Sequence, residues 1–236
     1  PMSSPPDARA PTYPPSSNIA ALTFDWSYQS GGMSRDSVSI EDGLSSYLRV
    51  RHASPWIGSE LELWDLFIDA RAFQPVPYLP GHVVAALVSG GVGIGHPARR
   101  ATFALGGLAD RDLTRDLLDG RRTGAGVLRG YPRAVVRGDA ECLTTLEYRF
   151  PLLELERGLE TLPLYVERVH AAAFTDLGLA FSGAPVPTEF LAGVGAELRL
   201  ELMVGYYGSV LVRLGYARGV NRKGIDQPYL VMGFPY

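Results

Sequence analysis

Apolar and polar residues alternate along most of the chain from residue 18 onward. Between Gly193 and Val204, aliphatic and small side chains occupy every second position, and Glu197, Arg199 and Glu201 stand between them. Successive side chains of a strand point to opposite faces, so this segment predicts a strand with one aliphatic and one charged face. Nine such runs are recognisable, near 18–30, 44–54, 60–74, 82–94, 138–151, 163–181, 189–205, 208–219 and 228–236. We therefore expect an all-β protein, in which only 109–119 could form a helical turn or two.

The lengths and ends of the runs favour a transmembrane antiparallel β-barrel. Many runs have about ten residues, whereas strands of soluble domains average about 5–6 and a tilted bilayer-spanning strand needs about 9–11. Aromatic residues such as Trp26 and Tyr28 stand at the ends of apolar faces, as in the aromatic girdles of membrane barrels. We expect short joints such as 205–208 at one end of the barrel and longer joints, 31–43 and 219–227, at the other. A soluble β-sandwich or jelly roll also alternates and is the other fold considered.

Composition divides the chain into two parts. Residues 1–17 contain six prolines and several serines, which predicts a disordered linker or tail, and 18–236 form the barrel part. The net charge of −3 does not favour a nucleic-acid partner. No stretch approaches the ~18 apolar residues of a membrane helix. The N-terminal residues do not resemble a signal peptide, so we expect a mature or excised fragment, or export directed by another segment.

The sequence carries no pattern of catalytic or metal-binding residues. A Gly-x-Ser-x-Gly motif is absent, and no recognisable serine or cysteine nucleophile accompanies His170. The period of two places His170 on the same face as Arg168 and Asp176, so we expect a polar residue facing the barrel lumen. The other histidines lie in separate runs, without the spacing of metal ligands. We therefore expect no enzyme activity, no cofactor and no metal.

Three short motifs lie in the second half of the chain. The segment 95–137 is too long for an ordinary hairpin joint, and its last part contains Leu128-Arg129-Gly130-Tyr131. The second run after it contains Phe174-Thr175-Asp176-Leu177-Gly178, and the last run places Leu230, Met232, Phe234 and Tyr236 on one face. Together these motifs resemble those of the BamA/Sam-type outer-membrane protein assembly factor superfamily, also called the bacterial surface antigen family. The resemblance covers about 18–236 and departs from the family at Pro235.

The resemblance implies a fold and a function. It implies that 18–236 are the last nine strands of a sixteen-stranded barrel in the bacterial outer membrane, with the long loop folded into the lumen. Asp176, with Phe174 and Gly178 beside it, would be the acidic partner of Arg129. Leu230, Met232, Phe234 and Tyr236 would form a C-terminal targeting signal. The barrel would insert or export proteins through a lateral seam and the lumen loop.

The expected partners follow from the same resemblance. They are outer-membrane lipid, unfolded outer-membrane protein substrates, and a chain or segment that supplies the N-terminal barrel strands. The last is needed because the edges of an open sheet would be unpaired in lipid. A different function on the same strands is a structural or surface-anchor barrel attached to a soluble module. A soluble β-sandwich lectin is a third possibility. The domain that precedes residue 1 would discriminate between the first two.

Overall fold

The fold is described from a computed structural model of the chain. It describes residues 18–31, 42–96, 100–107, 127–158, 164–183, 190–204, 208–221 and 223–233. Three of the expectations fall outside these residues: the proline-rich tail 1–17, the helical turn in 109–119, and the terminal aromatics Phe234 and Tyr236.

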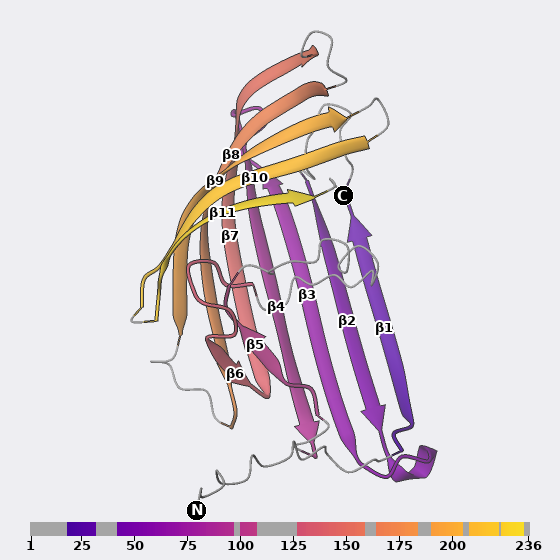
Figure 1. Ribbon diagram of the computed structural model, residues 1–236. Coiled ribbons are helices and arrows are strands. Elements are labelled where there is room, and N and C mark those ends of the chain that lie inside the picture. The colour runs from indigo at the N-terminus through magenta and orange to yellow at the C-terminus, as the bar shows by residue number, and fades with distance from the viewer. Residues whose placement is uncertain are drawn as a thin grey trace, which may run out of the picture.

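Nine strands form one antiparallel sheet, and their order in the sheet is their order along the chain (Figure 1). They are β1 (Ala21–Ser30), β2 (Gly43–Ala53), β3 (Leu63–Pro75), β4 (Val83–Gly95), β7 (Ala140–Gly158), β8 (Leu164–Phe181), β9 (Leu191–Val204), β10 (Gly208–Gly219) and β11 (Asp226–Gly233). The all-β expectation is confirmed, and each predicted run corresponds to one of these strands. The helical element seen is a 3₁₀ turn, η1 (Pro55–Ile57). Within the part of the chain described here, no helix has the length and apolarity needed to cross a membrane.

The sheet is open. Among the described strands, β1 pairs with β2 alone and β11 with β10 alone, so these two strands are its edges. The sheet therefore does not close into a barrel by itself. Neighbouring strands are antiparallel throughout, so β1 and β11, the first and last of nine, run in the same direction.

Two further strands lie in the long segment 95–137. β5 (Phe103–Leu105) and β6 (Val136–Gly138) pair with each other and contact β8. We call the face of the large sheet that they cover the inner face. A Cβ on Gly91 would lie within 3.0 Å of the Phe103 ring, so the missing side chain makes room for this hairpin. The alternation missed both strands because three residues are too few to display a period of two.

The opposite, outer face is apolar, as the alternation predicted, and many of its side chains are exposed. Side chains from both ends and the middle of the sheet are each more than a third exposed on it: Leu22, Phe24, Trp26, Tyr28, Trp64, Leu66, Ile68, Leu146, Tyr148, Leu198, Leu214, Tyr216, Leu230 and Met232. The inner face carries the charged side chains, including Glu147, Asp176 and Arg199, which are buried. The two faces therefore differ sharply in chemistry.

One expectation about the joints is wrong. The short joint 205–208 and the longer joint 31–43 were expected at opposite ends of the sheet. β9 and β1 run in the same direction, however, so the joints that follow them leave the same end. The reason is that direction alternates with every strand, and an odd number of strands separates β1 from β9. Strand parity, and not joint length, decides at which end a joint lies.

Candidate functional site

Three central strands, β7, β8 and β9, build a polar surface on the inner face. Residues two apart on a strand share a face, so Thr145 and Glu147 of β7 point the same way, as do Phe174 and Asp176 of β8. The strand register places Thr145 directly beside Asp176. Glu197 of β9 completes the surface, against which residues 127–131 pack.

Arg129 and Asp176 form a buried, bidentate ion pair. The Arg129 Nε and Nη2 atoms each donate a hydrogen bond of 2.7 Å, to Oδ2 and Oδ1 of Asp176 respectively. The backbone N–H of Arg129 donates a third, of 3.2 Å, and the Thr145 hydroxyl a fourth, of 2.8 Å. Two parallel bonds between a guanidinium and a carboxylate combine charge with fixed geometry. The predicted contact between Arg129 and Asp176 is present.

Further groups hold the Arg129 guanidinium. Its Nη1 donates to Glu147 Oε1 at 3.2 Å and lies 3.8 Å from Glu197 Oε1. Its Cζ lies 3.4 Å from the centre of the Phe174 ring, a close cation–π contact. Burial opposes the charged form, but the bonds and charge of Asp176 and the charges of the two glutamates raise the pKa of Arg129 above its ordinary value. The loop arginine is therefore charged in its buried position.

The pair belongs to a larger buried ion cluster that the sequence analysis did not find. Arg199 donates to Glu147 at 2.9 Å and also pairs with Glu197. Arg213 donates to Glu197 at 2.8 Å, and the Tyr229 hydroxyl does so at 3.0 Å. Buried charges are tolerated when each has a partner, as here. The charged residues at alternate positions of β9 were a signal for this cluster, but their partners on other strands were not visible in the sequence.

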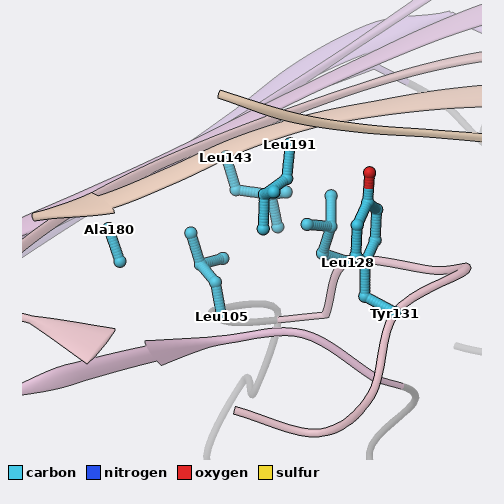
Figure 2. Close-up of a cluster of buried hydrophobic side chains, with 6 residues drawn as sticks. All are labelled: Leu105, Leu128, Tyr131, Leu143, Ala180 and Leu191. Atoms are coloured by element: carbon cyan, nitrogen blue, oxygen red, sulfur yellow. The ribbon is translucent and has the colours of Figure 1, made fainter. Parts of the chain in front are cut away.

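An apolar cluster beside the ion pair holds the neighbouring motif residues. Leu128 and Tyr131 are fully buried, and the cluster also contains Leu105, Leu143, Ala180 and Leu191. Figure 2 shows the loop side chains rising toward Leu143 and Leu191 of the sheet. A Cβ on Gly178 would lie 3.4 Å from a methyl group of Leu128. Each of Phe174, Asp176 and Gly178 thus borders the docked loop.

Glycines let the loop backbone lie directly on the sheet. A Cβ on Gly193 would come within 3.0 Å of the Arg129 carbonyl oxygen, and one on Gly219 equally close to that of Gly130. Gly130 itself has a φ of +83°, a left-handed conformation that favours glycine. No local pattern marked Gly193 or Gly219 as part of the site, because their contacts come from a distant segment.

The Tyr131 hydroxyl extends the docking to the β10–β11 joint. It lies 2.7 Å from the Ala192 carbonyl oxygen and 2.9 Å from Asn221 Oδ1, and it accepts a bond of 3.1 Å from the Ala192 N–H. These contacts link the loop, the start of β9 and the joint after β10. The hydroxyl, not only the ring, is therefore used in docking.

Replacing Tyr131 by phenylalanine should lower the free energy of unfolding by about 1–3 kcal/mol, since the ring still packs but buried polar groups lose their partner. A denaturant titration of both proteins measures the difference. Tyr78→Phe is the control, because Tyr78 is fully exposed. A Tyr131→Phe protein as stable as the Tyr78→Phe protein would contradict a role for the hydroxyl.

Two residues of the expected targeting signal, Leu230 and Met232, lie away from this site. Leu230 and Met232 are exposed on the outer face, opposite the ion cluster. Their partners in the motif, Phe234 and Tyr236, are beyond the described residues, so the signal stays a prediction. His170, expected on the same face as Asp176, is partly buried there opposite Arg199.

The site contains buried charged and apolar groups that bind one another across segments far apart in the chain. Where the structure describes side chains, no group of histidine, cysteine, aspartate or glutamate residues is arranged to hold a metal ion. The contacts of the site anchor residues 127–131 to five consecutive strands of the sheet, from β7 to β11. Comparison of the sequence with models of known families and with curated proteins found no match.

Proposed function

We propose that the chain is the C-terminal part of an outer-membrane β-barrel that inserts or exports proteins, like the BamA/Sam-type factors that its motifs resemble. The observation that carries the proposal is the meeting of two motifs 47 positions apart in one buried site. Arg129 lies on Asp176 and Phe174, and Leu128 lies on Gly178. A loop arginine without a shared role would be expected in solvent. The joint docking of the whole motif supports the resemblance.

The two-faced sheet supports a membrane location. A soluble sandwich buries its apolar faces and leaves charges to water, whereas here charged groups are buried under the loop and the outer face exposes aliphatic and aromatic residues. Apolar patches that extend over many strands mark contact with a partner or with lipid. In the proposed barrel, the outer face contacts lipid and the loop lies in the lumen.

Strand parity constrains the partner that would close this barrel. In lipid each edge must pair, so further strands would connect β11 to β1. Because these two edges run in the same direction, closure with antiparallel neighbours alone requires an odd number of added strands. Seven added to the nine present would complete the sixteen strands that the resemblance implies. A second copy closing about the same axis would pair β1 with β11 in parallel, so we favour a different chain or segment.

The seam beside β11 is where substrate would enter. An extended segment of an unfolded outer-membrane protein would add to this edge by β-augmentation, which uses backbone bonds and tolerates many sequences. No cofactor or nucleotide is needed for such a step. If depleting the protein left other outer-membrane proteins inserted normally, the barrel would instead be a structural or surface anchor.

Replacing Leu214 by arginine tests the membrane location. Leu214 is 56% exposed on the outer face, between Leu198 and Leu230 of the adjacent strands. An arginine facing lipid costs about 2–4 kcal/mol near the bilayer centre, so the variant should disappear from the outer-membrane fraction. Leu214→Ile, which stays apolar, should fractionate like the original protein. Normal membrane levels of Leu214→Arg, or a protein soluble without detergent, would contradict the barrel.

A further inference from the structure

The docked loop also contacts the free edge of the sheet. The Gly130 N–H donates to Gln227 Oε1 at 2.9 Å, and the Ile225 N–H donates to the Gly130 carbonyl oxygen at 2.9 Å. Gln227 belongs to β11, which has one neighbouring strand in the described sheet. The residue next to Arg129 is thus bonded to the edge strand and to the residue that precedes it.

A second route joins the edge strand to the ion pair. The buried Tyr229 of β11 packs with Phe174 and Ala217, and its hydroxyl donates to Glu197. The Phe174 ring lies under the Arg129 guanidinium, and Glu197 lies near it. Tyr229 of β11 therefore contacts two of the groups that surround the Arg129 guanidinium.

These contacts matter because an edge strand is held on one side only. β11 has eight residues, and short strands with few partners open more readily than central ones. The bonds of Gly130 and Tyr229 add contacts from the inner face to those that β10 provides. Loss of the docked loop would remove the Gly130 bonds from the beginning of β11.

We infer that residues 127–131 and β11 form one cooperative unit, in which Gln227 is a positioning residue that transmits loop docking to the edge strand. Arg129 fixes the loop on β7 and β8. Gly130 is the next residue of the loop, and it is hydrogen-bonded to Gln227 and Ile225. The consequence for an added strand rests on the proposed function: a partner would meet β11 in one register while the loop is docked.

Amide hydrogen exchange of the folded full-length chain in detergent tests the coupling. Arg129→Ala should speed exchange in 226–233 on the order of tenfold, although the Arg129 side chain donates its hydrogen bonds to Asp176 of β8 and Glu147 of β7. Coupling is reciprocal, so Gln227→Leu should speed exchange in 127–131. Gln227→Glu keeps an acceptor oxygen for the Gly130 N–H and should restore protection in 127–131.

A matched control separates coupling from general loosening of the edge. Tyr216→Phe removes the bond from the Tyr216 hydroxyl to Asp226, which is on the outer face and does not involve the loop. It should change the exchange rate in β11 and leave the amides of 127–131 protected. If Arg129→Ala does not fold, Arg129→Lys keeps the charge without the fork and should act in the same direction.

Unchanged exchange in 226–233 after loss of the Arg129 fork would overturn the inference. Equal behaviour of the Gln227→Glu and Gln227→Leu proteins would do so as well. Both results are independent of where the protein resides, because exchange is measured in the folded chain. The proposed membrane function is tested by the Leu214 variants, so the two can fail separately.

Discussion

Replacing Arg129 by alanine should lower the free energy of unfolding by about 3–5 kcal/mol, the loss typical of a buried ion pair with one partner removed. Asp176 is fully buried, and without the guanidinium its carboxylate would keep the Thr145 hydroxyl as its side-chain partner. Equilibrium unfolding in denaturant gives the difference. Faster proteolysis within 95–137 should accompany it, because the loop is no longer anchored.

The Asp176→Ala change should be costly too, although Arg129 then keeps its bond to Glu147. The double variant should be little less stable than Arg129→Ala, because residues of one buried pair are not additive. Asp25→Ala, which breaks the exposed Arg49–Asp25 pair, is the control and should change stability little. Strictly additive losses at 129 and 176 would show that the two residues act separately.

Replacing Gly193 by alanine should displace the loop almost as strongly as replacing Arg129 by alanine. Its Cβ would lie within 3.0 Å of the Arg129 carbonyl oxygen, and neither the β9 backbone nor the loop backbone can rotate away as a side chain does. We expect a loss of about 1–3 kcal/mol from overpacking, together with cleavage of the loop by added protease.

Gly178→Ala is the matched comparison for Gly193→Ala. Its Cβ would meet methyl groups of Leu143, Leu105 and Leu128 at 3.3–3.4 Å, and these side chains can adjust. The loss should therefore be smaller and the loop should stay protected. Equal protease sensitivity of the two alanine variants would mean that close backbone approach at Gly193 does not hold the loop.

The strands of the sheet could be predicted from the sequence alone. Every second residue of a strand meets the same surroundings, so a sheet with one apolar face leaves a local record in each strand, as in β9. The same record placed Asp176 on the face that carries Arg168 and His170. It could not identify β5 and β6, which are too short, and loop length misled the placement of the joint 31–43.

The Arg129–Asp176 pair was predicted by resemblance to a family and not by any local pattern. Nothing within either segment indicates a partner 47 positions away. The rest of the site was missed for the same reason. Arg213, Gln227 and Gly193 look like ordinary strand residues until the strands are set side by side.

The sequence by itself determined the nine strands, their two faces and the motifs that meet. Only the tertiary structure decided which charges pair, which glycines receive the loop backbone, and that the loop tip reaches the edge strand β11. The physical reason is the range of the interactions. Alternation is a property of consecutive residues, whereas ion pairs and close backbone contacts depend on the register between strands and on how the long loop returns to the sheet.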